Sequence, residues 1–170
     1  MEKIMVVNAG SSSLKFQLME MPNEVIITEG IVERIGSKDA YYTIKINGIK
    51  DKEILPIRDH AEAVKKVLED LVNRQIVKSL EEISGVGHRV VQGGWYFQDS
   101  AIIDDSVIDK IEELCDLAPL HNTPNLIGIK AFSKALPTVP SVAVFDTSFH
   151  QTMQPDAYMY ATPYEWYTKY

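Results

Sequence analysis

The 170-residue sequence is short of cysteine, of basic charge and of long apolar runs. Its one cysteine, Cys115, excludes an intrachain disulfide framework and a thiolate metal cluster, and this composition is typical of a reducing compartment. Lys and Arg number 17 against 24 Asp and Glu, and the net charge of −7 opposes a broad nucleic-acid or anionic-membrane surface. No stretch approaches the ~20 consecutive apolar residues of a membrane helix, and the run at 1–7 is too short for a secretory signal. We therefore expect a cytoplasmic protein with no nucleic-acid and no membrane partner.

Two common catalytic patterns are missing as well. The 4 histidines are too scattered for a His-x-x-x-His zinc site. No Gly-x-Ser-x-Gly elbow occurs, so a hydrolase triad has no anchor. Hydrophobic residues nevertheless make up 45% and charged residues 24% of the chain, which is enough to fill a core. The sequence predicts a folded domain of ordinary size.

The first third of the chain has the pattern of β-strands. Short apolar or alternating runs lie at 4–7, 14–18, 25–32 and 41–46. Asn47-Gly48 is a strong hairpin signal before Ile49. These features predict a β-meander over the first fifty or so positions.

Helices and strands alternate in the rest of the chain. Apolar residues at helical spacing over 61–72 follow Asp59, and Glu62 three residues later completes a capping-box pattern. Short apolar runs at 83–91 and 141–145 predict buried strands. The sequence therefore predicts an α/β fold in which a meander precedes alternating helices and strands.

Two further helices lie between those strands. One is predicted from behind Asp104 to 118, where Pro119 stops it. The next is predicted to have Thr123 as its N-cap and Pro124 as its first helical residue.

The turn after the first strand could bind an anion. Asn8-Ala9-Gly10-Ser11-Ser12-Ser13-Leu14-Lys15 is dense in backbone and hydroxyl donors and ends in a cation, and such turns can direct several N–H groups at phosphate oxygens. It lacks the second glycine and the Lys-Ser/Thr pair of a Walker loop. A plain hairpin turn with an exposed lysine is the alternative.

Two later segments carry charged groups at the edge of predicted strands. Arg89 stands in an otherwise apolar strand, where a guanidinium needs an anion, although it could also face solvent or pair with a local acid. Asp146 follows the strand 141–145, where ligands of open α/β sheets usually sit, and it could hold Mg²⁺ or simply cap the loop. His88 should lie on the face opposite Arg89 and be structural. His121-Asn122, beside a helix start, fits either an anion site or a capping turn.

Taken together, four ordered segments resemble the acetate and propionate kinase family of the actin/hexokinase/heat-shock-70 superfamily. They are Asn8–Phe16, Gly87–Gly94, Pro119–Asn122 and Phe145–His150. The resemblance implies a ribonuclease-H-like (actin-like ATPase) domain, with a mixed sheet, an amino-terminal β-meander and flanking helices. It implies Mg²⁺-dependent transfer of the γ-phosphoryl group of ATP to acetate, giving acetyl phosphate and ADP.

The resemblance also implies roles for individual residues. Arg89 would hold the acyl carboxylate, and Asp146 occupies the catalytic acid/base position of the family. Because a carboxylate acceptor, with a pKa of ~4.3 like that of Glu, is already ionised at neutral pH, we expect Asp146 to act mainly by ordering Mg²⁺-bound water. The ATP phosphates would contact Lys15, Ser11 and Ser12, and the metal would lie near Asn8.

The chain departs from the family in two ways. Gln92 stands where the family usually has histidine, which bears on the shape of the acyl pocket. The family chain is more than twice as long, and we expect residues 1–150 to form the amino-terminal domain and residues 151–170 to begin the crossover to a second actin-like domain absent from this chain. The aromatic run from Tyr158 to Tyr170 would be covered by that missing domain.

The expected activity follows from these departures. The chain would carry half of the active site and be inactive alone, while the full-length family protein would be a homodimer. The alternatives are propionate kinase, which the motifs do not separate from acetate kinase, and a non-catalytic folded fragment.

Overall fold

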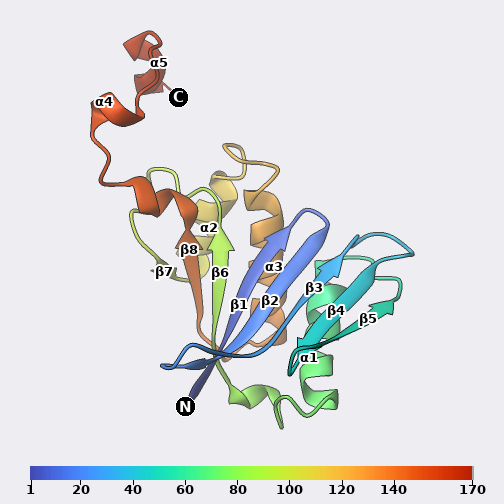
Figure 1. The fold of residues 1–170 in the computed structure, drawn as a ribbon. Helices are drawn as coiled ribbons and strands as arrows, with labels where there is room; N and C mark the ends of the chain where they lie inside the picture. Colours follow the sequence, from blue (N-terminus) through green and yellow to red (C-terminus); the bar gives the residue numbers. More distant parts are fainter. Residues whose placement is uncertain (170) are drawn as a thin grey trace.

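The computed structural model describes residues 1–169, and an eight-stranded mixed sheet runs through them (Figure 1). The first five strands form an antiparallel meander: β1 (Glu2–Gly10), β2 (Ser13–Met21), β3 (Val25–Glu33), β4 (Tyr41–Ile46) and β5 (Ile49–Ile54). On its other side β1 pairs in parallel with β6 (Ile83–Val90), which pairs in parallel with β8 (Ser141–Phe145). A two-residue strand, β7 (Ala101–Ile102), closes that edge antiparallel to β8. The predicted mixed sheet with an amino-terminal meander is confirmed.

Three helices accompany the sheet: α1 (His60–Asn73), α2 (Asp105–Glu113) and α3 (Asn122–Ala135). Single 3₁₀ turns lie at Leu80–Glu82 and at Asp146–His150. Two short helices follow, α4 (Pro155–Tyr158) and α5 (Tyr164–Lys169), and they extend away from the sheet in Figure 1. None of the helices in residues 1–169 combines the length and apolarity required to cross a membrane.

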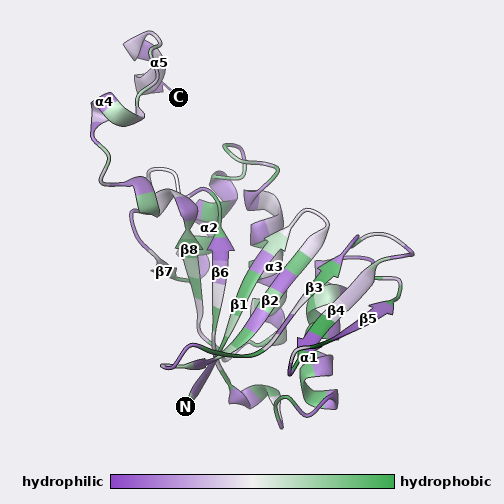
Figure 2. Cartoon of the chain, in the orientation of Figure 1, coloured by the Kyte–Doolittle hydropathy of each residue, from purple (hydrophilic) through white to green (hydrophobic). Residues whose placement is uncertain are grey.

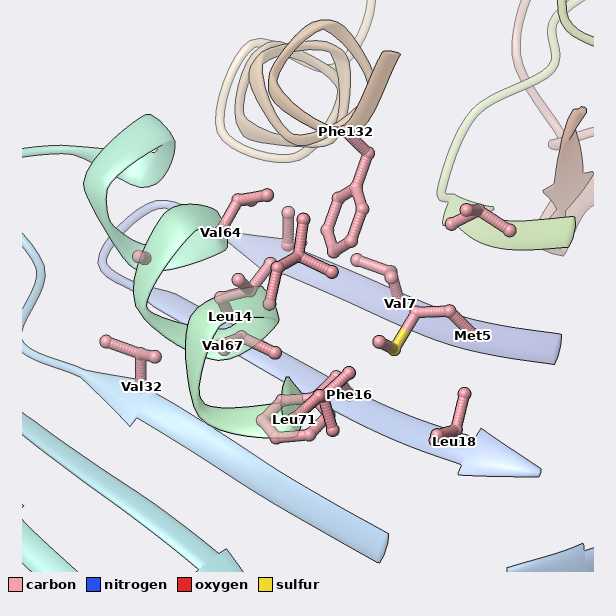
Figure 3. Packing of buried hydrophobic residues seen from close by; sticks show 14 of the residues in the cluster. Met5, Val7, Leu14, Phe16, Leu18, Val32, Val64, Val67, Leu71 and Phe132 are labelled. Atoms are coloured by element: carbon pink, nitrogen blue, oxygen red, sulfur yellow. The ribbon is translucent and has the colours of Figure 1, made fainter. Parts of the chain in front are cut away.

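One face of the sheet is covered by helices because its strands alternate. Met5, Val7 and Ala9 of β1 are buried, whereas Val6 between them is 40% exposed. Figure 2 shows the corresponding alternation of hydrophobic and hydrophilic residues along the strands. Figure 3 shows the buried side chains of β1, β2 and β3 meeting those of α1 and Phe132 of α3. The opposite face of β1 and β2 therefore stays open, and it holds the candidate site.

A second, smaller core supports the strand ends of β6 and β8. Val90, Phe145 and Ile129 are buried there, and the ring of Phe97 stacks on that of Phe145 with centroids 4.2 Å apart. This packing holds the loop after β6 against the end of β8, which brings together the residues that follow the two strands.

The start of α1 has the predicted capping box, except that one of its two hydrogen bonds involves a different residue. Asp59 is the N-cap, and its side chain accepts from the Glu62 amide as expected. The Glu62 carboxylate, however, accepts from the backbone N–H of Arg58 rather than from that of Asp59, so the reciprocal bond of the capping box lies one residue upstream.

The boundaries of the other two helices differ from the prediction. The third helix begins at Asn122, two residues before the predicted Pro124, and His121 rather than Thr123 is its N-cap. Pro124 is tolerated because its missing N–H falls within the first turn, where no intrahelical bond is made. The second helix ends at Glu113 instead of 118, since residues after Leu114 tighten into turns closed by the Leu117 and Ala118 amides on the Leu114 carbonyl.

These caps make a simple stability prediction. Asp59→Ala removes a side-chain acceptor from the start of α1 and is expected to lower the free energy of unfolding by about 1 kcal/mol. Thr123→Ala is the matched control, because the exposed Thr123 caps nothing and its loss should change stability by less than about 0.5 kcal/mol. Urea unfolding of both variants measures the difference, and a larger loss for Thr123→Ala than for Asp59→Ala would contradict it.

The aromatic carboxy-terminal segment is exposed. Tyr160, Tyr164 and Trp166 have relative exposures of 88%, 66% and 54%, and the hydroxyls of Tyr158 and Tyr167 lie 3.0 Å apart. Tyr170, which belongs to the same predicted aromatic run, lies outside the described residues.

Candidate active site

Three polar side chains meet at the carboxyl ends of parallel strands. β1, β6 and β8 run parallel, so Asn8 near the end of β1, Arg89 near the end of β6 and Asp146 directly after β8 reach the same edge of the sheet. Successive side chains of a strand point to opposite faces of the sheet. Val7 and His88 are buried on the face that the helices cover, so their neighbours Asn8 and Arg89 lie on the open face. The sequence placed each residue on its strand, and the parallel pairing brings them together.

Arg89 makes the central contacts. Its Nε donates to Oδ1 of Asp146 at 3.0 Å and its Nη2 to Oδ2 at 2.6 Å, while Nη1 lies 3.5 Å from Oδ1 of Asn8. The hydrogen-bonded Asp146 carboxylate raises the pKa of Arg89 above its usual range. The side chains of Arg89 and Asp146 are 49% and 41% exposed, and pairs this open to water contribute only ~0–1 kcal/mol. Either partner can therefore exchange the other for a ligand at small cost.

The phosphate-type turn lies beside this pair. Ser11 and Ser12 form the exposed two-residue connection between β1 and β2, because Gly10 pairs with Ser13. Lys15 is directly opposite Asn8 in the same pairing, so both side chains lie on the same face. Within residues 1–169 the Lys15 ammonium makes no ion pair. The β1–β2 hairpin thus presents two exposed hydroxyls, and Lys15, which makes no ion pair within the described residues, lines the same cavity as Arg89.

His60, which the sequence analysis did not single out, holds this turn from behind. Its Nε2 lies 2.7 Å from the carbonyl oxygen of Gly10, and a carbonyl can only accept, so Nε2 carries the proton. In the same turn, the backbone carbonyl of Ser12 accepts a hydrogen bond from the amide of Ile35. His60 is buried at the start of α1, fifty positions from the turn, and no local pattern in the sequence connects the two.

The loop after β6 is fixed by Asn122 rather than by a helix cap. Asn122 is fully buried, and its carboxamide accepts from the Gln92 amide at 3.0 Å and donates to the Gln92 carbonyl at 2.8 Å. The Gln92 side chain folds back to accept from the Gly94 amide, and Thr147 Oγ1 accepts from the Gly93 amide. The segment is also a capping turn, one of the two predicted alternatives, because His121 is the N-cap of α3 and the His121 and Asn122 amides donate to the Ala118 carbonyl.

His88 has the structural role that strand alternation predicts. It is 2% exposed on the face opposite Arg89 and packs edge-to-face on Phe132 with centroids 5.5 Å apart. Burial lowers the pKa of the imidazole to about 4, and its Nε2 has no hydrogen-bond partner within residues 1–169. The side chain is therefore neutral at pH 7 and takes no part in ligand binding at the open face.

A cavity of about 510 Å³ lies on the open face next to these residues. Asn8, Lys15 and Arg89 line one end, and Lys45 and Lys50 reach it from the meander. The Lys45 ammonium is paired with Glu29 at 2.8 Å and the Arg89 guanidinium with Asp146 at 2.6 Å, whereas Lys15 makes no ion pair within residues 1–169. The cavity is thus lined by both Lys15 and Arg89, the two cations that the sequence marks as candidate anion-binding residues.

The oxygen atoms at the site suit a hard cation only in part. Residues 1–169 contain no cluster of three or more His, Cys, Asp or Glu side chains that could hold a metal ion. The Asp146 carboxylate and the Asn8 amide oxygen, both next to Arg89, are the donor types that Mg²⁺ takes when substrate phosphates and water complete its shell. The donor set fits a metal shared with a phosphate ligand and not a site made by the protein alone.

An antiparallel meander continued by two parallel strands, with polar groups gathered at the strand ends, is the fold of the actin-like ATPases. The sequence model described as the acetokinase family matches residues 3–170, so the chain belongs to that family. Curated acetate kinases of Bacillus cytotoxicus and Bacillus mycoides are each 61% identical to it over 170 residues. The chain spans 43% of the length of these relatives.

Two solved structures have the same fold. The crystal structure of Porphyromonas gingivalis acetate kinase superposes with a TM-score of 0.95 at 42% identity, over 99% of this chain and 43% of the other. That of a propionate kinase from Francisella tularensis gives 0.91 at 38% identity with the same coverage. The ribonuclease-H-like, actin-like fold predicted from the sequence motifs is confirmed.

Proposed function

We propose that this chain supplies the phosphate-turn and acyl-binding half of an acetate kinase site, which transfers the γ-phosphoryl group of ATP to acetate. The observation that carries the proposal is the meeting of Arg89, Asp146 and Asn8 beside the turn that bears Lys15. Membership of the acetokinase family supports the reaction class, and the curated acetate kinases at 61% identity favour acetate over propionate as acceptor.

Arg89 is the proposed acetate-binding residue. Its guanidinium already holds a carboxylate through Nε and Nη2, so the geometry for a second carboxylate ligand is in place. Acetate would replace the Asp146 carboxylate at the Arg89 guanidinium. Little stability would be lost, because the Arg89–Asp146 ion pair is half-exposed and weak. The acceptor oxygen would then lie between Arg89 and the phosphate turn.

The turn and Lys15 are proposed to bind the ATP phosphates. Ser11 and Ser12 are exposed and offer hydroxyl and backbone donors, and Lys15 adds a charge that no acid neutralises within the described residues. Phosphoryl transfer depends chiefly on alignment and on neutralising the charge of the transferred group, which these donors serve.

Asp146 and Asn8 would hold Mg²⁺ through their oxygens, and the ion when bound would neutralise charge on the phosphates. Asp146 has no proton to remove, because the acetate acceptor is already ionised at neutral pH. Once released from Arg89, its carboxylate orients water and metal-bound groups at the strand end, which makes it a positioning charge rather than a general base.

The domain assignment is part of the same proposal. Residues 1–150 would form the amino-terminal actin-like domain, and residues 151–170 the beginning of the connection to a second domain carrying the adenosine site. The exposure of Tyr160, Tyr164 and Trp166 supports this, since aromatic surface of that kind is normally covered. We also propose assembly as a homodimer, which the family resemblance implies, and a cytoplasmic location, which the composition with one cysteine favours.

Hydroxamate formation from acetate, ATP and Mg²⁺ tests the function. The chain alone is expected to give no turnover, because a single missing transition-state arginine already costs ~10³–10⁵ in rate in related phosphoryl transfer. Adding the carboxy-terminal part of the Bacillus cytotoxicus acetate kinase should restore acetyl phosphate formation, with acetate preferred to propionate. Turnover by the chain alone after extensive repurification would refute the half-site, and a preference for propionate would refute the acceptor.

A further inference from the structure

The sheet splits between β1 and β6 at the candidate site. Their parallel pairing runs from Lys3 and Ile83 to Val7 and His88 and then stops. Beyond that point β1 remains paired with β2 as far as Gly10, and β6 with β8 as far as Val90. In Figure 1 the two strands start close together and diverge toward their arrowheads. Asn8 and Arg89 lie on the two sides of this gap.

The side chain of Asn125, from α3, fills the gap. Its Oδ1 accepts from the backbone amide of Val91 at 3.1 Å, and its Nδ2 donates to the backbone carbonyl of Ala9 at 2.7 Å. A carboxamide offers the same donor and acceptor as a peptide group. Asn125 therefore makes, across a wider spacing, the kind of bonds that the two strands would otherwise make with each other.

The position of α3 over β1 is set by a second feature. Asn125 is 4% exposed, and one turn later on the same helical face stands Gly128. A Cβ added to Gly128 would lie 2.6 Å from Cβ of Ala9, which is closer than two carbon atoms can approach. The helix thus rests directly on Ala9, and this close approach allows the short Asn125 side chain to reach the strand.

We propose that Asn125 is a positioning residue that holds the ends of β1 and β6 at a fixed separation. Ala9 is one residue from Asn8, and Val91 is two residues from Arg89, so the carboxamide sets the distance between the metal and phosphate side of the site and the acyl-binding side. The catalytic meaning of that distance rests on the proposed function, whereas the geometric role does not. Asn122, on the same helix, directs both of its carboxamide hydrogen bonds to Gln92, and within residues 1–169 its side chain makes none to β1.

Asn125→Ala in the 170-residue chain is the first test, read by NMR. The Val91 amide should exchange with solvent about 10- to 100-fold faster, because its buried acceptor is gone. The side-chain amide of Asn8 and the Nε–H of Arg89 should both shift, while the amides of the paired region below Val7 and His88 keep their protection. Thr123→Ala, exposed on the same helix, is the control and should reproduce the wild-type spectrum.

Asn125→Asp gives a reversible version of the same test. A protonated carboxyl has one donor and one acceptor and replaces the amide, whereas an ionised carboxyl can only accept and repels the Ala9 carbonyl. Burial raises the pKa of such a carboxyl. The Asn8 and Arg89 signals should therefore match the wild-type chain at about pH 5 and move away from it at higher pH, and the wild-type chain at each pH is the reference.

Two results would overturn the proposal. One is a loss of Val91 protection in Asn125→Ala with unmoved Asn8 and Arg89 signals, since the amide would then be a local structural bond only. The other is a failure of the Asn8 and Arg89 signals of Asn125→Asp to approach the wild-type signals on acidification. This second result also decides the matter if Asn125→Ala does not fold. No substrate enters these measurements, so a failure of the acetate kinase assay would leave their outcome intact.

Discussion

In the chain complemented with the carboxy-terminal part of an acetate kinase, Arg89→Leu is expected to lower kcat/KM for acetate by about 10²- to 10³-fold, because the two charge-assisted hydrogen bonds to the acetate carboxylate are lost. The KM for ATP should change little, since Ser11, Ser12 and Lys15 belong to the β1–β2 hairpin and not to β6. Steady-state kinetics with acetate and with ATP varied separately measure the two effects. Arg89→Lys should be intermediate, because it keeps the charge and loses the planar fork.

Stability separates this loss from unfolding. The Arg89–Asp146 pair is half-exposed, so Arg89→Leu should change the free energy of unfolding by no more than about 1 kcal/mol. Arg58→Leu is the matched control, because Arg58 also pairs with a carboxylate, Glu62, at the surface of α1 and lies outside the site. Unchanged acetate kinetics in Arg89→Leu, or an equal defect in Arg58→Leu, would show that Arg89 is an ordinary strand residue.

The strands that carry the site could be predicted because their signals are local. An apolar run followed by Asn8 and a turn, a lone arginine in an apolar strand, and Asp146 after a short buried run each place one polar group at a strand end. Parallel pairing of β1, β6 and β8 then brings them together at one edge of the sheet. Arg89 pairs with an acid, as one of the alternatives held, but that acid is Asp146, 57 positions away, and no local pattern in the sequence connects the two.

The bracing residues could not be predicted in the same way. His60 and Asn125 bind the carbonyls of Gly10 and Ala9, at the turn after β1, across 50 and 116 positions, and nothing in their immediate sequence indicates these partners. The start of α3 was misplaced because Thr123-Pro124 is a good local capping pattern, yet the helix extends back to Asn122 so that its amide can hold the Gln92 loop. Tertiary hydrogen bonds prevailed over local preference at this point.

Acidification is expected to destabilise the protein through His88. Its folded-state pKa of about 4 lies below the usual 6.5, so the unfolded chain binds a proton that the folded chain does not. The stability that the neutral, buried His88 maintains is fully present above pH 6.5 and is lost as the pH drops from 6.5 toward 4. The total loss in the free energy of unfolding over this range is about 3 kcal/mol. Urea unfolding at a series of pH values measures it.

His88→Leu should remove that part of the pH dependence, because the apolar side chain keeps its packing on Phe132 and has no proton to take up. Since carboxylates titrate in the same range, the informative quantity is the difference in unfolding free energy between the wild-type chain and the variant at each pH. His150→Leu, at an exposed position, controls for the loss of an imidazole and should retain the wild-type slope. Parallel curves for the wild-type chain and His88→Leu would contradict the prediction. His88 and Arg89 are adjacent on β6, so a charge forced into the core at His88 acts on the strand that positions the Arg89 guanidinium. The Arg89 Nε–H signal should therefore broaden or shift over the same acidic range in the wild-type chain and stay in place in His88→Leu.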